Sequence, residues 1–261
     1  NNNVEKPLVK IFWTGGYDST FRMVQLSRSD LTIQPYYLCD DQRCSEKNEL
    51  KAITTITADI EKHPETKCTI LPLLKFRIDA FKPDKSICEA YGRLHKLTSI
   101  GPQYQWLAEF AKTNQGIELC LEKAGNGRAY NCIRNYGAIK RMKEGDLLYG
   151  VIDPEQSNED LIRIFGNFHL PLPLFETTKL EMREEYIGMG FGETMYRTWF
   201  CHTPVKNEPC GVCNPCKAVV EEGLAFRISS AGMKRYRTEM KFGNYFWFKF
   251  LKKIRHRLVR Y

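Results

Sequence analysis

The sequence predicts an α/β fold in which a parallel sheet is flanked by helices and a cysteine cluster follows near the C-terminal end. Three observations predict it: short apolar runs alternate with helical patterns, a glycine turn follows the first run, and four cysteines lie close together late in the chain. With 261 residues and 43% hydrophobic content, the chain is long enough to bury one sizeable core.

The elements are expected to alternate along the chain. The predicted strands are five apolar, β-branched or aromatic runs, Val9–Trp13, Ile33–Leu38, Thr69–Leu74, Ile117–Leu121 and Leu147–Ile152. Helical patterns are found at residues 20–28, 46–62, 102–114 and 134–144. Right-handed crossovers gather the loops after parallel strands at one edge, where open α/β sheets bind ligands. We expect that edge to receive Thr14–Asp18, Cys39–Arg43 and Gly150–Pro154.

The first of these loops carries the most specific pattern, Thr14-Gly-Gly-Tyr-Asp-Ser-Thr20. Two adjacent glycines let the backbone turn sharply and approach a ligand closely, and the hydroxyls of Ser19 and Thr20 lie beside the unpaired amides of a helix start. This combination favours a phosphate-binding loop, although Gly-Gly after a strand can also be a plain tight turn. The loop has neither the lysine of a Walker motif nor the three glycines of a dinucleotide motif.

Two further segments carry candidate functional residues. Asp40 and Asp41 end the second predicted strand, where a carboxylate can contact an adenosine ribose or a cation. The alternative is that both are solvent-exposed loop residues. Thr178-x-x-Glu181 is typical of a capping box that begins a helix from Lys179 to Ile187. A lysine in the first turn opposes the helix dipole, which a bound phosphate would explain; the alternative is a solvent-facing side chain.

The chain has ten cysteines and no apolar signal-peptide core, so we expect a cytoplasmic protein with thiols or a metal site rather than disulfides. Cys201, Cys210, Cys213 and Cys216 have the spacing C-x8-C-x2-C-x2-C, which suits a closed tetrahedral zinc site that stabilises the fold without catalysing; thiol chemistry is the alternative. The other six are scattered, as small buried side chains usually are.

The glycine-rich loop resembles the Ser-Gly-Gly-x-Asp-Ser pyrophosphate loop of the N-type ATP pyrophosphatases, with Thr14 in place of the first serine. The ordered set of motifs resembles the 7-cyano-7-deazaguanine synthase family of ligases, which acts in queuosine biosynthesis. The resemblance covers roughly residues 9–228 and rests on this loop, Asp41-Gln-Arg43, Pro173–Glu181, Arg197–Cys201 and Cys210–Cys216.

The resemblance implies an adenine nucleotide alpha hydrolase-like fold, a homodimer, and ATP, Mg²⁺ and Zn²⁺ as ligands. A carboxylate such as 7-carboxy-7-deazaguanine would be adenylated and then attacked by ammonia, giving an amide or a nitrile. It implies ATP binding by Thr14, Gly15, Gly16, Asp18, Ser19 and Thr20, with Asp18 and Lys179 catalytic. Its weaker implications are substrate or nucleotide contacts at Asp41, Gln42, Arg43, Tyr104, Gln105 and Asp153.

Two segments depart from the family pattern and leave the substrate open. Pro102-Gln-Tyr104-Gln105 stands where the family has Pro-x-Arg-Asn, and Asp153 is followed by Ser157, Asn158 and Glu159 where the family has tyrosine, proline and aspartate. Candidates for a replacement anion contact, each of which is otherwise an exposed basic residue, are Arg77, Arg93, His95, Arg128 and Arg134.

Three other functions remain open. The acid could be conjugated to a protein amine, as by relatives in antiphage defence systems. The chain could be a tRNA thiolase that uses Cys39 and Cys44, or an adaptor that binds nucleotide without turnover.

The predicted domains are an ATP-binding domain (1–200), a zinc segment (201–232) and a basic, aromatic extension (233–261). That extension has ten Lys and Arg against one acid, which accounts for the net charge of +8. Its composition suits an anionic partner such as a membrane, RNA or an acidic protein; packing of a terminal helix on the core is the alternative.

Overall fold

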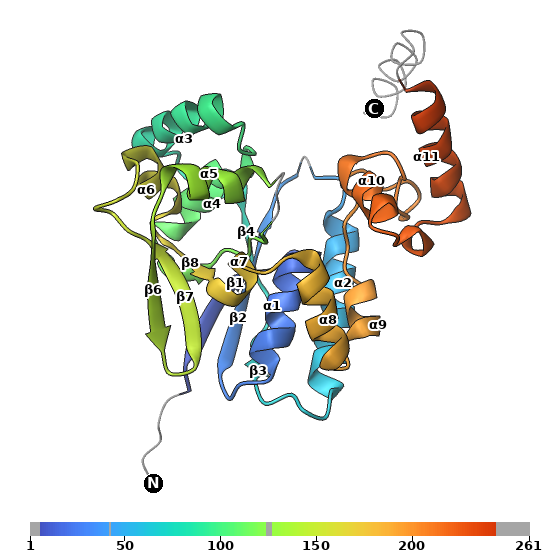
Figure 1. Cartoon of the computed structure of the whole chain (residues 1–261), viewed down its shortest axis with the longest axis horizontal. Helices are drawn as coiled ribbons and strands as arrows, with labels where there is room; N and C mark the ends of the chain where they lie inside the picture. The colour runs from blue at the N-terminus through green and yellow to red at the C-terminus, as the bar shows by residue number, and fades with distance from the viewer. Residues whose placement is uncertain (1–5, 42, 124–126, 244–261) are drawn as a thin grey trace. The chain divides into compact units, whose positions relative to one another are not determined.

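The computed structural model describes residues 6–41, 43–123 and 127–243 (Figure 1). Gln42 and the extension from residue 244 onward lie outside these ranges. The chain forms two compact units: residues 1–41 and 49–199 make up the first, and residues 42–48 and 200–261 the second, as far as these are described. The predicted boundary at residue 233 falls inside a helix of the second unit. In the described residues no helix combines the length and apolar character needed to cross a membrane.

The first unit is built on one twisted, mainly parallel sheet with the strand order β3-β2-β1-β5-β8-β7-β6 (Figure 1). Its strands are β1 (Leu8–Phe12), β2 (Thr32–Cys39), β3 (Thr69–Ile70), β4 (Leu74–Arg77), β5 (Ile117–Glu118), β6 (Ile139–Glu144), β7 (Leu147–Ile152) and β8 (Phe168–Pro171). Both β3 and β4 pair with β2 in parallel, whereas β7 is antiparallel to β8 and to β6. The predicted fold class, an α/β fold with a parallel-dominated sheet, is therefore confirmed.

Helices cover both faces of this sheet. They are α1 (Tyr17–Ser27), α2 (Glu46–Lys62), α3 (Lys85–Thr98), α4 (Gln103–Ala111), α5 (Arg128–Tyr136), α6 (Glu159–Phe165), α7 (Leu172–Phe175), α8 (Lys179–Gly188) and α9 (Gly192–Tyr196), with a 3-10 turn η1 (Ile78–Ala80). Helices α3 to α6 pack together, as do α1, α8 and α9. Side chains of neighbouring strand residues point to opposite faces of the sheet. Phe12 therefore packs in the core that includes residues of α3 to α6, and Ile11 packs in the core that includes residues of α1, α8 and α9.

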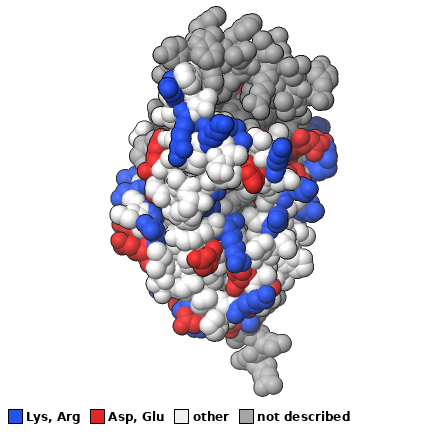
Figure 2. Space-filling view, turned by 90° about the vertical axis from the view of Figure 1, so that its right-hand side faces the viewer, with Lys and Arg blue, Asp and Glu red and all other residues white. Residues whose placement is uncertain are grey.

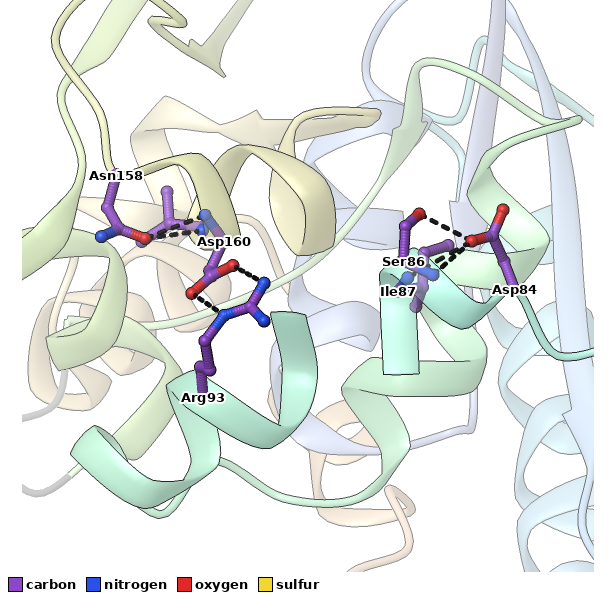
Figure 3. Close-up of polar contacts among 7 residues, drawn as sticks. Asp84, Ser86, Ile87, Arg93, Asn158 and Asp160 are labelled. Atoms are coloured by element: carbon purple, nitrogen blue, oxygen red, sulfur yellow. Dashed lines mark hydrogen bonds and ion pairs between the residues drawn. The ribbon is translucent and has the colours of Figure 1, made fainter. Parts of the chain in front are cut away.

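Side-chain caps fix where two of these helices begin (Figure 3). Asp84 accepts hydrogen bonds from the backbone N–H groups of Ser86 and Ile87 at the start of α3. Asn158 does the same for Asp160 and the next residue at the start of α6. Each cap satisfies amides that the helix itself leaves unpaired. Asn158 therefore has a structural role at one of the positions that depart from the family pattern.

The second unit is small and contains α10 (Asn214–Glu221), a 3-10 turn η2 (Ala225–Arg227) and α11 (Ser230–Phe242). Helix α11 begins at the cap Ser229, whose hydroxyl oxygen accepts from the N–H of Gly232. From this helix the Nε of Arg235 donates to the carbonyl of Cys210 at 2.8 Å. The first residues of the predicted extension thus form part of this unit.

Three expectations about elements were wrong. Residues 134–144 are not one helix: α5 ends at Tyr136 and the chain continues as β6, which forms a hairpin with β7 through Gly145 at φ 57°. The run Leu147–Ile152 is a strand, but it is antiparallel to its neighbours. Its following loop, with Asp153, consequently lies at the amino end of β8 and not at the edge where β1 ends. Helix α3 was not predicted.

Candidate functional site

The loop between β1 and α1, Thr14–Ser19, is called the glycine loop below. Gly15 has φ 68°, and a Cβ there would lie 3.0 Å from the backbone oxygen of Glu49, so only glycine fits without strain. The N–H of Trp199 donates to the carbonyl of Gly15 at 2.8 Å and holds the turn. Helix α1 starts at Gly16 with no side-chain cap among the described residues. Its first amides are thus placed to receive an anion.

The loop is anchored from inside by Thr20. This residue is fully buried, and its hydroxyl oxygen accepts a hydrogen bond from the indole Nε1 of the equally buried Trp13 at 3.0 Å. The Thr20 hydroxyl is therefore hydrogen-bonded to a core side chain. Thr14, Asp18 and Ser19 are partly exposed. They supply the polar side chains of the loop.

The glycine loop follows β1, the strand from which successive strands are added to the sheet on opposite sides. Strand β1 stands between β2 and β5; after β1 the chain crosses to β2, whereas after β5 it passes to β6, β7 and β8 on the other side. Open α/β sheets bind their ligands at the carboxyl ends of two strands from which the chain diverges in this way. The glycine loop and the residues directly after β5 follow these two strand ends.

The predicted catalytic lysine lies beside the loop after β5. The Nζ of Lys179 is 3.4 Å from Oε1 of Glu122, and their side chains are 39% and 15% exposed. The predicted capping box is confirmed: Thr178 Oγ1 accepts from the N–H of Glu181, and the Glu181 carboxylate accepts from the N–H and the hydroxyl of Thr178. This hydroxyl lowers the pKa of Glu181. Lys179 is thereby held in the first turn of α8.

Glu122 was missed in the sequence, although an acid directly after the fourth apolar run could have been read as a residue of the binding edge. A second acidic residue, Asp18, also influences its surroundings. Tyr104 is buried, and burial, followed by the negative charge of Asp18, raises its pKa to about 12. Burial likewise raises the pKa of Cys120, to which the Asp18 charge adds. The Asp18 carboxylate thus adds to the effect of burial on both groups.

A buried ion pair joins α1 to β5. Arg22 donates through Nε and Nη2 to the two carboxylate oxygens of Glu118 at 2.8 and 2.7 Å, and both residues are about 95% buried. Burial alone would lower the pKa of Arg22, but the Glu118 carboxylate outweighs it and raises this pKa. The bidentate geometry fixes the helix that follows the glycine loop against strand β5. No local sequence pattern indicates this pair, since its partners are 96 residues apart.

The weaker site predictions are placed less favourably. Asp41 forms an exposed, bidentate ion pair with Arg77, which also binds Asp79. Gln105 donates to the sulfur of Cys88, and Asp153 accepts from the N–H of Glu155 within its own turn. Arg43 belongs to the second unit, where its Nε donates to Ser45, and Gln42 lies outside the described residues. Asp41, Arg43, Gln105 and Asp153 therefore each have a polar partner of their own in the structure.

Most candidates for a replacement anion contact already have partners. Arg77 binds two aspartates, Arg93 binds Asp160 (Figure 3), and Arg128 donates to the carbonyl of Ser99. A ring nitrogen of His95 lies 2.8 Å from the carbonyl of Ile100. Arg134 differs: it lines a cavity and has no hydrogen-bond or ion-pair partner among the described residues.

The four predicted metal ligands converge in the second unit. A tetrahedral zinc with Zn–S bonds of about 2.3 Å separates its sulfurs by about 3.8 Å. The Sγ atoms of Cys210 and Cys216 are 3.8 Å apart, those of Cys201 and Cys213 are 3.9 Å apart, and all four lie within 4.8 Å of one another. Disulfide bonding would need about 2.05 Å. The cluster is therefore suited to zinc.

Backbone amides support the same assignment. The sulfur of Cys210 accepts from the N–H groups of Val212 and Cys213, and the sulfur of Cys201 accepts from the N–H of Cys210. Stabilised thiolates are what a zinc ion requires. Four sulfur ligands leave no open position for water, so the site would be structural.

The fold and the cysteines together define the class of this protein: an α/β protein with a mainly parallel sheet flanked by helices and a C-terminal four-cysteine cluster. No model of a known protein family matches the chain. A search of curated proteins likewise finds no match.

Proposed function

We propose that the protein is an ATP-dependent ligase that adenylates a carboxylate, releases pyrophosphate and then forms a carbon–nitrogen bond. The observation that carries the proposal is the glycine loop. It joins strand β1 to helix α1, which has no side-chain cap among the described residues, at the point where the strand order of the sheet reverses. The positive end of α1 and the backbone amides of its first turn suit a polyphosphate. The motif resemblance assigns that polyphosphate to ATP and its splitting to AMP and pyrophosphate.

The proposed reaction has two steps. A carboxylate oxygen of the acid attacks the α-phosphorus of ATP; an acyl–phosphate bond forms, the bond between the α-phosphorus and the bridging oxygen breaks, and pyrophosphate leaves. A nitrogen nucleophile then attacks the acyl carbon, AMP leaves, and the nitrogen loses a proton to solvent. Neither step requires a protein nucleophile. The residues act by positioning and by compensating charge.

Residues of the glycine loop and of the start of α8 would bind the phosphates and the metal ion. The amides of the glycine loop, with Thr14 and Ser19, would hold the β,γ-phosphates, and Asp18 would hold Mg²⁺, which supplies positive charge to the leaving pyrophosphate. Lys179 would contact a phosphate, and Glu122, at 3.4 Å, positions its ammonium group. Arg22 and Glu118 keep α1 in place but touch no reactant.

The resemblance favours 7-carboxy-7-deazaguanine as the acid. With ammonia as the nucleophile the product is an amide, which a second activation would dehydrate to a nitrile. With a protein amine the product is a conjugate. The residues that depart from the family pattern include Tyr104, whose pKa the Asp18 charge helps to raise, and the proposal therefore keeps both acceptors, ammonia and a protein amine.

The proposal is tested by incubating the zinc-loaded protein with Mg-ATP and 7-carboxy-7-deazaguanine, with and without ammonium, and measuring AMP, pyrophosphate and products by mass spectrometry. We expect AMP that depends on the acid. Nitrile or amide with ammonium identifies ammonia as the acceptor, and an adenylate that persists in its presence indicates a different amine.

Two variants and one control make this test specific. Asp18→Asn and Lys179→Met should each lower AMP formation at least about a hundredfold, as loss of one stabilising charge does. Asp30→Asn, at an exposed aspartate paired only with Lys6 among the described residues, should leave it unchanged. ATP binding without acid-dependent AMP for any acid tried would support the adaptor function and contradict the ligase.

A further inference from the structure

Two chain segments that contact Gly15 continue directly into the second unit. On one side, the backbone oxygen of Glu49 lies 3.0 Å from where a Cβ of Gly15 would be. On the other, the N–H of Trp199 donates to the carbonyl of Gly15 at 2.8 Å. The chain neighbours of these two residues, Asn48 and Phe200, belong to the second unit. The turn of the glycine loop is thus held by segments whose next residues fold with the cysteine cluster.

Inside the second unit, the residues that follow these segments are tied to the cysteine cluster. Cys201 is fully buried, two residues after Trp199, and its sulfur accepts from the N–H of Cys210 at 3.2 Å. The loop between these two cysteines contains Asn207, whose carbonyl accepts a hydrogen bond from Nδ2 of Asn48 at 3.1 Å. Both ends of that loop would be fixed once its two cysteines share a zinc ion. Zinc binding would therefore order both segments next to Gly15.

The first unit holds the same segments from its own side. Nη1 of Arg197 donates to both carboxylate oxygens of Asp59 in α2, at 2.8 and 3.0 Å. Glu49 is 3% exposed, and its carboxylate accepts from the hydroxyl of Tyr37 at 2.7 Å. These contacts do not involve the cysteines. Loss of the metal should consequently loosen the glycine loop without unfolding the first unit.

We propose that the cysteine cluster regulates the glycine loop: zinc occupancy orders the turn at Gly15 and so sets the affinity of the loop for its phosphate ligand. With zinc bound, Trp199 and α2 hold the loop amides in one arrangement. Without zinc, the ligand has to order the loop as it binds, which lowers its affinity. The inference rests on the proposed function for the identity of the ligand, ATP, but the order of the loop can be measured without any nucleotide.

The first test is hydrogen exchange of the full chain, followed by mass spectrometry, with zinc and after its removal by a chelator. Peptides that contain the glycine loop or Trp199 should exchange at least about fivefold faster without zinc, the lower end of typical coupling between sites. Strand β8 should exchange equally in both forms, which shows that the first unit remains folded. Unchanged exchange of the loop and Trp199 peptides would overturn the inference.

The second test is calorimetry with Mg-ATP, in which the Kd should be at least about fivefold higher for the zinc-free protein. Two glycines inserted between Phe200 and Cys201 keep all four cysteines but lengthen the junction. The zinc-loaded insertion variant should bind Mg-ATP as weakly as the zinc-free protein. The same insertion after Gly223, which has open space around it, is the control and should leave the dependence on zinc intact. Equal affinities of the two insertion variants would contradict the coupling.

A substitution at Asn48 distinguishes this coupling from a general structural effect. Asn48→Leu removes the hydrogen bond to Asn207 and should raise the Kd for Mg-ATP about threefold in the zinc-loaded protein, the effect of one neutral hydrogen bond. It should have no effect in the zinc-free protein. Asn114→Leu is the matched control, since it removes a hydrogen bond of 3.1 Å to the carbonyl of Phe110 within the first unit. Equal effects of Asn48→Leu in both forms would contradict the inference.

The same measurements separate the two proposals. Exchange of the glycine loop that responds to zinc, together with no ATP binding in either form, supports the coupling and contradicts the ligase. Acid-dependent AMP formation, with loop exchange and ATP affinity that are both independent of zinc, supports the ligase and contradicts the coupling.

Discussion

Single residues decide whether the glycine loop can exist. Gly15 combines a positive φ with a close approach to the backbone of α2, and the local sequence pattern was enough to locate it. The same holds for Lys179, because its capping box is local. Arg22 and Glu118 could not be found in this way, since they are 96 residues apart and a charged residue in isolation does not reveal its partner.

Gly15→Ala should therefore damage both the loop and its ligand. A residue with a Cβ at φ 68°, 3.0 Å from the Glu49 oxygen, is strained by about 1 kcal/mol or more, and the loop amides should shift. We expect ATP affinity to fall at least about tenfold, measured by calorimetry with Mg-ATP. Gly145→Ala is the matched control, because Gly145 also has a positive φ but open space around it. Equal ATP affinities for both variants would contradict this role of Gly15.

At the scale of elements, contacts between distant segments hold the site. The sequence located β1, β2, α1 and α2 within a few residues, since each has a clear periodicity of its own. The sequence-based prediction was wrong at residues 134–144, where a single helical pattern covers the end of α5 and all of β6. Residues 139–144 alternate in polarity too little to be recognised as a strand; their hairpin partner β7 makes them one.

Removing one partner of the buried pair Arg22–Glu118 should lower the free energy of unfolding more than removing both partners. Glu118→Gln leaves the buried guanidinium without its counter-charge and should lower the free energy of unfolding by about 3–5 kcal/mol, measured by urea denaturation. The double variant Arg22→Met with Glu118→Leu should recover much of that loss, because no charge is then buried. A double variant as unstable as the sum of its singles would contradict the coupling.

We expect the cysteine cluster, when it holds zinc, to stabilise the second unit. Gly211 has φ 83°, and a Cβ there would lie 2.1 Å from the carbonyl oxygen of Gly232 in α11. Gly211→Ala should reduce the zinc content after purification and expose the unit to proteolysis, as should a strong chelator acting on the wild type. Gly223→Ala, at φ 77° with open space around it, is the control. Full zinc content in Gly211→Ala, measured by atomic emission, would contradict this packing.

At the scale of the whole molecule, the layered architecture followed from the alternation of elements, but the strand order and the direction of β7 did not. Whether a strand is parallel or antiparallel depends on which neighbouring strand supplies its hydrogen bonds. A short apolar run of residues does not reveal that neighbour. The surface offered equally little guidance. On the face that Figure 2 presents, acidic and basic side chains of the described residues both occur, so the net charge marks no single site there.

The stability of the first unit should decrease in mild acid. His169 stacks on Tyr149 with centroids 3.8 Å apart, and burial lowers its pKa below the ordinary 6.5. Below pH 6.5 the unfolded chain takes up a proton that the folded chain resists, so stability present at pH 7 is lost as the pH falls. His169→Gln should show a flatter decrease between pH 7 and 5.5 in urea denaturation. Parallel pH profiles of the two proteins would contradict this assignment.

The outermost strand β6 limits how the protein can assemble. An edge strand presents unpaired backbone groups, and a second copy could in principle continue the sheet by pairing there. Strand β6 carries Lys140, Arg141 and Lys143 within six residues, all exposed. In such a pairing the cations of one copy would face those of the other. The expected homodimer should therefore join through other surfaces, and growth of the sheet into fibrils is opposed at this edge by charge.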